Sequence, residues 1–282
     1  MRTEHTLCSL RGRLQQWRMA GESVALVPTM GNLHAGHLAL VKQAQQQADR
    51  VVVTIFVNPT QFGVGEDFSS YPRTLERDTR LLTQAEVDLL FAPGVEQLYP
   101  GGQCDGTYVE VPGLSGILCG ASRPGHFRGV ATVVTKLFNA VQPDIALFGE
   151  KDYQQLLVIR RMTRELCLPV DIIAVPTVRE SDGLALSSRN GYLTEEQRER
   201  APLLYKSLLS CKEQIFSGKR DYASLVSQAE ADLLAAGFEP DYFEVRRADN
   251  LAEPTIDTHE LVILAAARLG RTRLIDNISF SL

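Results

Sequence analysis

Short apolar runs alternate with segments of helical periodicity through the first 176 residues of the chain. The apolar runs predict strands at residues 23–28, 51–58, 87–92, 144–149 and 170–175. In the remaining segments apolar residues recur at helical spacing, which predicts helices over residues 6–19, 37–49, 72–84, 129–141 and 152–167. Because strands and helices alternate, we expect crossover units on a parallel sheet. Strands that are apolar on both sides favour a sheet covered on both faces.

The pattern changes after residue 176. Helices are predicted over residues 194–216 and 222–236, ahead of strands at residues 242–248, 260–268 and 272–279. This order favours a smaller α+β domain, and the alternation in the last strand favours an antiparallel sheet. The expected fold class is therefore α/β, a Rossmann-like parallel sheet over residues 1–176 with helices on both faces, plus a smaller C-terminal α+β domain over residues 177–282. Within the first domain, the Gly- and Pro-containing segment 93–124 is predicted to be irregular, with a short strand at residues 107–111.

The composition narrows the class of protein. A chain of 282 residues with 44% hydrophobic side chains can build a sizeable core, so we expect a soluble globular protein. A net charge of −5 with scattered basic residues argues against nucleic-acid binding, because phosphate contacts need clustered Lys and Arg. We expect no signal peptide, no membrane span and a cytoplasmic location. The odd number and wide spacing of the cysteines argue against a disulfide framework or a zinc ribbon; they are Cys8, Cys104, Cys119, Cys167 and Cys211.

Two histidines occur at the first predicted strand-to-helix turn, in the sequence Pro-Thr-Met-Gly-Asn-Leu-His-Ala-Gly-His of residues 28–37. Such a turn directs backbone N–H groups and the positive end of the helix dipole beyond the strand, where phosphate binds well. His34 and His37 resemble the signature of the adenylyl-transferring superfamily that includes cytidylyltransferases and class I aminoacyl-tRNA synthetases. An ordinary helix start capped by a histidine is the alternative. A zinc site lacks a third ligand at a suitable spacing.

A second candidate segment lies at the end of the strand at residues 144–149, where Lys151 precedes a helix. In open parallel sheets the residues beyond the carboxyl ends of the strands line the ligand crevice, so Lys151 and the backbone of Gly149 are expected to face the site of the two histidines. The helix dipole disfavours a positive charge at the helix N-terminus. An anionic ligand bound there would explain why Lys151 occupies this position. The alternative is a solvated charge at a helix start.

A third candidate segment, residues 179–190, is a polar loop at the domain boundary. Ser187, Ser188 and Arg189 supply hydroxyl and guanidinium donors for the oxygens of a triphosphate, and a loop can close over such a ligand. An ordinary turn or helix cap is the alternative.

A fourth candidate is Gln61, which follows the strand at residues 51–58. Its amide offers a donor and an acceptor to a small hydroxylated acid, while a plain polar loop is equally consistent with the pattern. The segments 71–74 and 125–129 are read first as helix starts, and His126 and Arg128 either assist phosphate binding or serve the structure.

Taken together, six motifs resemble the pantothenate synthetase (pantoate–β-alanine ligase) family, in the family's order and across residues 24 to 193. They are residues 28–37, Asn58-Pro-Thr-Gln-Phe-Gly63, Tyr71-Pro-Arg-Thr74, Gly125-His-Phe-Arg-Gly-Val130, Phe148-Gly-Glu-Lys-Asp152 and Leu186-Ser-Ser-Arg-Asn190. The carboxyl-terminal third matches in length and character with weaker signatures.

The resemblance implies an AMP-forming ligase of coenzyme A biosynthesis. (R)-Pantoate and ATP would give pantoyl-adenylate and diphosphate, and β-alanine would then displace AMP to give pantothenate. His37, His34 and Lys151 would be catalytic, and Gln61 and Gln155 would bind pantoate. The resemblance assigns ATP contacts to Met30, Gly31, Asn32, Leu33, His34, Ala35, Gly36, His37, Gly149, Glu150, Lys151, Asp152, Val178, Leu186, Ser187, Ser188 and Arg189.

The resemblance also implies Mg²⁺ bridging the phosphates of ATP, and a homodimer. Some relatives carry a run of acids after the Tyr-Pro-Arg-Thr motif. This chain has Leu75-Glu-Arg-Asp78 there, so no protein metal ligand is assigned. An aminoacyl-tRNA synthetase is disfavoured by the lack of a basic anticodon module. A nucleotidylyltransferase and a nucleotide-sensing module stay open, and analysis of the products formed from ATP, pantoate and β-alanine separates them.

Overall fold

The computed structural model of the chain describes residues 1–63, 65–102 and 106–282. The chain forms two compact units. Unit 1 comprises Met1–Glu150 and Val158–Pro176, and unit 2 comprises Lys151–Leu157 and Thr177–Leu282. The short segment Lys151–Leu157 thus belongs to unit 2, whereas the sequence-based boundary lies between residues 176 and 177.

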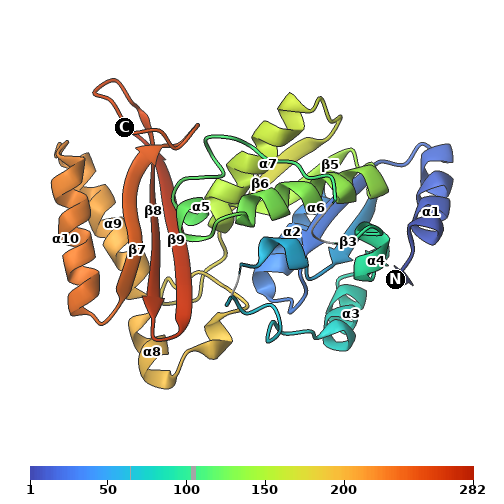
Figure 1. Ribbon diagram of the computed structural model, residues 1–282, viewed down its shortest axis with the longest axis horizontal. Coiled ribbons are helices and arrows are strands. Elements are labelled where there is room, and N and C mark those ends of the chain that lie inside the picture. Colours follow the sequence, from blue (N-terminus) through green and yellow to red (C-terminus); the bar gives the residue numbers. More distant parts are fainter. Residues whose placement is uncertain (64, 103–105) are drawn as a thin grey trace. The chain divides into compact units, whose positions relative to one another are not determined.

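Unit 1 contains a six-stranded sheet in the order β1-β4-β3-β2-β5-β6, and every strand pair is parallel (Figure 1). Its strands are β1 (Arg2–Glu4), β2 (Val24–Thr29), β3 (Arg50–Ile55), β4 (Leu89–Phe91), β5 (Ile145–Gly149) and β6 (Asp171–Val175). Its helices are α1 (Leu7–Met19), α2 (Ala35–Gln45), the 3-10 helix η1 (Pro59–Gln61), α3 (Leu75–Gln84), α4 (Val95–Leu98), α5 (Cys119–Ser122) and α6 (His126–Val141). After β5 come the 3-10 helix η2 (Glu150–Asp152) and α7 (Tyr153–Glu165).

Helices cover both faces of this sheet, which confirms the predicted fold class. On one face, Leu40 and Val41 of α2 and Leu82 of α3 pack into a cluster with alternate strand residues such as Val27 and Val53. On the other face, α6 packs against β2 and α1. Because successive strand side chains point to opposite faces, continuously apolar strands are what two covered faces require.

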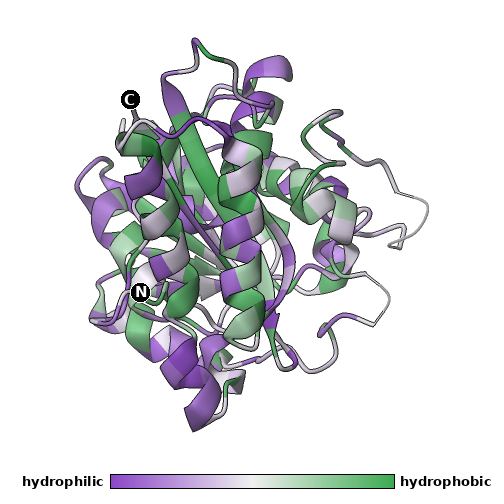
Figure 2. Cartoon of the chain, turned by 90° about the vertical axis from the view of Figure 1, so that its left-hand side faces the viewer, coloured by the Kyte–Doolittle hydropathy of each residue, from purple (hydrophilic) through white to green (hydrophobic). Residues whose placement is uncertain are grey.

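Unit 2 contains a three-stranded antiparallel sheet, as the sequence predicts. Its elements are the 3-10 helix η3 (Asn190–Tyr192), α8 (Glu195–Arg200), α9 (Leu203–Phe216), α10 (Tyr222–Ala235), β7 (Glu239–Arg247), β8 (Glu260–Leu269) and β9 (Thr272–Ser281). Leu208 of α9 and Leu233 of α10 share a core with Leu261 and Ile263 of β8. Figure 2 views the chain from the left-hand side of Figure 1. The helices seen there carry both hydrophilic and hydrophobic residues, as expected for helices that cover a sheet on one face.

Four local predictions differ from the structure. The segment 93–124, predicted to be irregular, contains the short helices α4 and α5. Residues 107–111 form no strand, because the N–H of Val109 donates to Thr132 Oγ1 of α6 at 2.9 Å and so does not enter a strand ladder. The helix predicted over residues 194–216 is divided into α8 and α9 at Pro202, which has no N–H to donate. The pattern does not predict strand β1, because its three residues Arg2, Thr3 and Glu4 carry no apolar signal.

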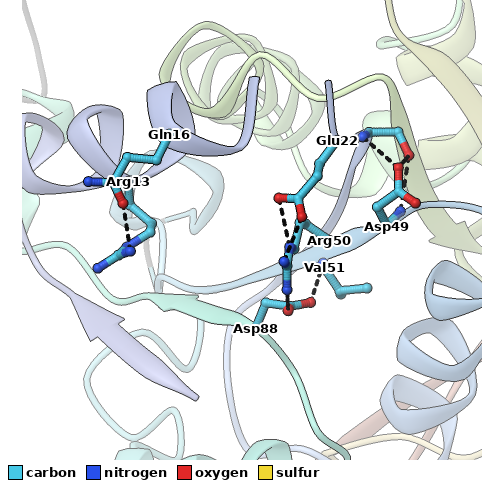
Figure 3. Close-up of polar contacts among 8 residues, drawn as sticks. Arg13, Gln16, Glu22, Asp49, Arg50, Val51 and Asp88 are labelled. Carbon is cyan, nitrogen blue, oxygen red and sulfur yellow. Dashed lines mark hydrogen bonds and ion pairs between the residues drawn. The ribbon is translucent and has the colours of Figure 1, made fainter. Parts of the chain in front are cut away.

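The amino ends of the central strands carry a cluster of paired polar groups (Figure 3). Arg50 donates to both carboxylate oxygens of Glu22 at 2.9 and 2.6 Å and to Asp88 at 2.9 Å. Asp88 also accepts the N–H of Val51 at 2.9 Å. These contacts tie together the turns that begin β2, β3 and β4.

The described cysteines show no shared site. Cys8 and Cys167 are exposed, Cys119 and Cys211 are buried, and Cys104 lies outside the described residues. Burial raises the pKa of Cys211 to about 11, so this thiol stays protonated at neutral pH. In the part of the chain that the structure describes, no helix combines the length and apolar character needed to cross a bilayer.

Candidate functional site

The carboxyl end of β2 leads into the turn that carries the two histidines. Gly31 and Asn32 both adopt positive φ, at 81° and 51°. Glycine takes this conformation without steric cost and asparagine tolerates it better than most residues, so the Gly-Asn pair allows the sharp reversal before α2. A Cβ at Gly31 would also lie 3.1 Å from a carboxylate oxygen of Asp78. The backbone of the turn therefore packs closely against that side chain.

Asp78, on α3, holds this turn in place. Its carboxylate is fully buried and accepts the N–H groups of Asn32 at 2.8 Å and Leu33 at 2.9 Å. It also accepts the hydroxyl of Thr74 at 3.0 Å. No sequence motif marks Asp78 as a residue that anchors this turn. The one sequence feature that could have revealed Asp78 is its i,i+4 spacing to the core residue Leu82. This spacing places an acid on the buried face of an amphipathic helix.

The two histidine rings lie together at the start of α2. His34 is the N-cap residue, and its Nδ1 accepts the N–H of Gly36 at 3.1 Å. His37 Nδ1 accepts the N–H of His34 at 3.3 Å, and the ring centroids are 4.1 Å apart. A neutral imidazole that accepts at Nδ1 carries its proton on Nε2. The backbone thus selects the tautomer in which each Nε2 is a hydrogen-bond donor. The capping contact of His34 is therefore compatible with a hydrogen-bond donor at Nε2.

Gln61 lies beside this turn. The side chain is buried, its Oε1 accepts from Asn58 Nδ2 at 3.0 Å, and its Nε2 donates to the sulfur of Met30 at 3.2 Å. Asn58 in turn accepts the hydroxyls of Tyr99 at 2.8 Å and Thr60 at 3.1 Å. The amide of Gln61 is therefore oriented by a buried network, with its NH₂ toward the histidine turn.

A second group of side chains holds the backbone of Gln61. The carbonyl oxygen of Gln61 contacts His126 Nδ1 at 2.8 Å and Arg123 at 3.4 Å. Arg123 also forms a paired contact with the carboxylate of Glu66, at 2.7 and 2.6 Å. Burial raises the pKa of Glu66 and the hydrogen bonds from Arg123 lower it, with a net shift below its ordinary value. Among the two roles left open for His126, these contacts support the structural one.

Arg128, the other residue of that motif, has its guanidinium 5.0 Å from the ring centroid of Tyr108. This cation–π contact accounts for its position on the surface of α6.

In unit 2, the segment that begins with Lys151 is tied to the antiparallel sheet. The carbonyl oxygen of Lys151 accepts the side-chain N–H of Asn277 at 2.9 Å. The hydroxyl of Tyr153 donates to the carbonyl oxygen of Ala248 at 2.9 Å. These contacts explain why Lys151, Asp152 and Gln155 belong to unit 2, although they follow a strand of unit 1.

The polar loop of unit 2 is a small hairpin followed by a turn. The N–H of Leu186 donates to the carbonyl oxygen of Val178 at 3.0 Å, and Arg179 and Ala185 form an antiparallel bridge. Beyond the hairpin, the N–H of Arg189 donates to Ser187 Oγ at 3.2 Å. The hairpin thus brings Val178 next to the start of the segment Leu186, Ser187, Ser188 and Arg189.

The structure therefore brings the candidate residues into two sets. The set in unit 1 combines Met30–His37, Gln61, Gly149 and Glu150, at the carboxyl ends of β2, β3 and β5, which are neighbours in the sheet. The set in unit 2 combines Lys151, Asp152, Gln155, Val178 and Leu186–Arg189. Among the described residues, no group of three or more His, Cys, Asp or Glu side chains is arranged to hold a metal ion.

Comparisons with known proteins agree over the whole chain. A sequence model of the family described as Pantoate-beta-alanine ligase matches residues 2–279. Pantothenate synthetase of Pseudomonas putida strain GB-1 is 59% identical over 278 residues, covering 99% of this chain and 97% of the relative. Pantothenate synthetase of Shewanella amazonensis is 58% identical over 281 residues, covering all of both chains.

Solved structures show the same likeness. The crystal structure of pantothenate synthetase from Thermus thermophilus superposes with a TM-score of 0.92 at 51% identity, covering 99% of each chain. Pantoate-beta-alanine ligase from Francisella tularensis, complexed with beta-gamma ATP and beta-alanine, superposes with a TM-score of 0.84 at 33% identity, covering 99% of this chain and 97% of the other.

Proposed function

The chain belongs to the pantoate-beta-alanine ligase family, and from this premise we propose that it joins (R)-pantoate to β-alanine with ATP through a pantoyl-adenylate. A carboxylate oxygen of pantoate attacks the α-phosphorus of ATP, and the bond from that phosphorus to the bridging oxygen breaks to release diphosphate. The amine of β-alanine then attacks the acyl carbon, loses a proton, and displaces AMP to give pantothenate. Activation comes first because a carboxylate is a poor acyl donor, whereas its anhydride with AMP has a good leaving group.

The observation that carries this proposal is that both His34 and His37 accept a backbone N–H at Nδ1, which leaves the proton of each neutral ring on Nε2. Both rings are fixed through Nδ1 by backbone N–H groups at the N-terminus of α2. Donors aimed at the α-phosphate would stabilise the negative charge that grows as the carboxylate attacks, without reorganising during the reaction. The N-terminus of α2 adds its own positive potential there. His37 is assigned the main catalytic contact, with His34 beside it.

Gln61 is proposed to bind pantoate. Its buried amide is already oriented by Asn58, so it can donate to a hydroxyl or carboxylate oxygen with little loss of side-chain entropy. Gln155 of unit 2 is assigned to the same substrate on the strength of the family resemblance.

The set in unit 2 is proposed to hold the rest of the nucleotide. Lys151, Ser187, Ser188 and Arg189 would neutralise and bind the phosphates, and Val178 would contact the adenine. In this proposal residues 1–176 bind ATP and pantoate, and residues 177–282 act as a lid.

Mg²⁺ is proposed to enter with ATP and to neutralise charge on its phosphates. Mg²⁺ commonly keeps several waters and binds through substrate phosphates. The residues present fit that mode. Asp78 is the acid that contacts the histidine turn, and its carboxylate is engaged with two backbone N–H groups and a hydroxyl, so the phosphates of ATP would supply the ligands for the metal. We also propose a cytoplasmic homodimer, and light scattering on the purified protein tests the dimer.

The decisive experiment follows the oxygen atoms. With pantoate labelled with ¹⁸O in its carboxylate, the proposed route transfers label to AMP, and diphosphate appears in equal amount. Release of diphosphate without free AMP would instead indicate a nucleotidylyltransferase. Absence of both products would indicate a nucleotide sensor.

A further inference from the structure

Strand β9 carries two adjacent buried polar residues, Asp276 and Asn277, which are 4% and 7% exposed. They pair with Ala265 and Leu264 of β8, in the middle of the ladder between β8 and the edge strand β9. A buried carboxylate or amide is costly unless its hydrogen bonds are satisfied. The partners of these two side chains therefore account for their presence in an otherwise apolar region.

Asp276 binds the hairpin of unit 2. Its two carboxylate oxygens accept from the two terminal nitrogens of Arg179, at 2.6 and 2.9 Å. The guanidinium also lies 3.6 Å from the ring centroid of Tyr205 and donates to the carbonyl oxygen of Gly183 at 3.0 Å. Arg179 thus links the tip of the hairpin to β9 by a paired, mostly buried contact, the geometry in which ion pairs are strongest.

The tip of the hairpin is itself tightly packed. Gly183 has a φ of 95°, and a Cβ there would lie 2.7 Å from Tyr205 Cδ1. Leu184, the next residue, is buried in the core beneath the sheet. The hairpin is therefore a rigid arm rather than a loose loop.

Asn277 binds the other candidate segment of unit 2. Its Nδ2 donates to the carbonyl oxygen of Lys151 at 2.9 Å, and its backbone carbonyl oxygen accepts from Arg179 at 3.3 Å. Successive residues of a strand point to opposite faces. Asp276 lies on the face that carries Leu274 and the helix-covered core, so Asn277 points to the other face. One strand thereby holds a segment on each side.

We propose that Asp276 and Asn277 are positioning residues that set the distance between Lys151 and the hairpin leading into Ser187–Arg189. The inference rests on the proposed function, which assigns both segments to the phosphates of ATP. Neither residue touches the nucleotide; each acts by placing groups that do. The carboxyl-terminal strand, whose sequence carries no signature of chemistry, would in this way determine affinity for ATP.

The test compares three variants of the full-length protein. Asp276→Asn removes the ionic pairing with Arg179, and Asn277→Ala removes the donor to Lys151. The matched control is Asp241→Asn, which breaks the contact of Asp241 with Arg273 Nε at 2.6 Å in the same sheet. For each variant we would measure the thermal unfolding midpoint, kcat, and KM for ATP and for β-alanine.

We expect Asp276→Asn and Asn277→Ala to raise KM for ATP about tenfold or more, because small misplacements of binding groups are costly, with KM for β-alanine nearly unchanged. Asp241→Asn should leave KM for ATP near that of the wild type, and it should lower the unfolding midpoint less than Asp276→Asn does, because its contact is exposed. Equal KM values for ATP in all three variants would overturn the proposal.

A milder variant tests the proposal in case Asp276→Asn or Asn277→Ala fails to fold. Arg179→Lys keeps the charge beside Asp276 but cannot form the two-nitrogen contact. It should raise KM for ATP by a smaller factor while remaining folded, and an unchanged KM would count against the proposal. Failure of the proposed function is seen separately, because the wild-type protein would then form no AMP or diphosphate.

Discussion

The two ends of the parallel sheet in unit 1 use polar side chains in different ways. At the amino ends, Arg50 is shared between Glu22 and Asp88, and charges are paired with charges (Figure 3). At the carboxyl ends, His34, His37 and Gln61 are held by backbone groups and by a neutral amide. The first arrangement satisfies charges within the protein. The second fixes the direction of hydrogen-bond donors.

A carboxylate binds backbone N–H groups at each end, which makes the comparison testable. Asp88 accepts the N–H of Val51 at the amino end, and Asp78 accepts those of Asn32 and Leu33 at the carboxyl end. The local chemistry is alike. The difference lies in what the anchored turn carries: a structural junction in one case and the histidine pair in the other. Substitutions at the two ends should therefore separate stability from activity.

The largest expected effect is that of His37→Ala. We expect kcat to fall by about 10²- to 10³-fold, as when one donor to a developing charge is removed. Stability should fall by only about 1 kcal/mol, because one hydrogen bond to the backbone is lost. Steady-state kinetics and urea unfolding measure the two effects. His259→Ala, at an exposed histidine, is the control, and turnover at the wild-type rate in His37→Ala would refute the catalytic assignment.

The next prediction compares the two anchoring carboxylates directly. Asp78→Asn and Asp88→Asn should each destabilise the protein, by about 1–3 kcal/mol where a buried N–H loses its acceptor. Only Asp78→Asn should also lower kcat/KM, by roughly tenfold or more, because the histidine turn shifts. Chemical unfolding and kinetics on both variants test this. Loss of activity in Asp88→Asn, at equal folded fraction, would contradict the distinction between the two ends.

Gln61→Ala should have a smaller and more selective effect. We expect KM for pantoate to rise by about tenfold, the value of one or two hydrogen bonds to the substrate, with KM for ATP little changed. Initial rates with each substrate varied in turn give both constants. Equal increases for the two ligands would argue against a pantoate pocket at Gln61.

The smallest effect is expected from acid titration of the amino-end cluster. The hydrogen bond from Arg50 holds the pKa of Glu22 below its ordinary value of 4.5. A carboxyl group whose pKa is lowered on folding adds stability at neutral pH, and this stability is lost as the pH falls through the folded pKa. Between about pH 5 and pH 3, the free energy of unfolding should therefore fall less steeply in Arg50→Met than in the wild type. Kinetic constants at pH 7 should be unchanged, and identical pH slopes would contradict the assignment.

Much of the fold could be predicted because it depends on local pattern. Strands β2 and β3 are apolar on both faces, and that property alone predicts covered parallel strands. The pattern does not predict the polar strand β1, because its pairing with β4 depends on the neighbouring strand and not on its own side chains. The strand predicted at residues 107–111 is wrong because a side chain of α6 takes the backbone N–H that a ladder would use.

The candidate site divides in the same way. Its candidate segments can be found from sequence motifs that follow predicted strands, because the residues of each motif are close together in the chain. The residues that hold the segments cannot be found in this way. Asp78, Asn58 and Asp276 look like ordinary polar residues in the sequence, and their partners lie 46, 3 and 97 positions away.

The sequence by itself determined the order of most elements and the parallel and antiparallel character of the two sheets, and it singled out the candidate segments for chemistry. These follow from periodicity and from residue type, which act over a few neighbouring positions. The tertiary structure alone decided which nitrogen of each histidine bears the proton, which way the amide of Gln61 points, and which strand anchors Lys151 and the hairpin. Each of those depends on a hydrogen bond whose partner is selected by three-dimensional packing, and such a partner leaves no mark on the local pattern.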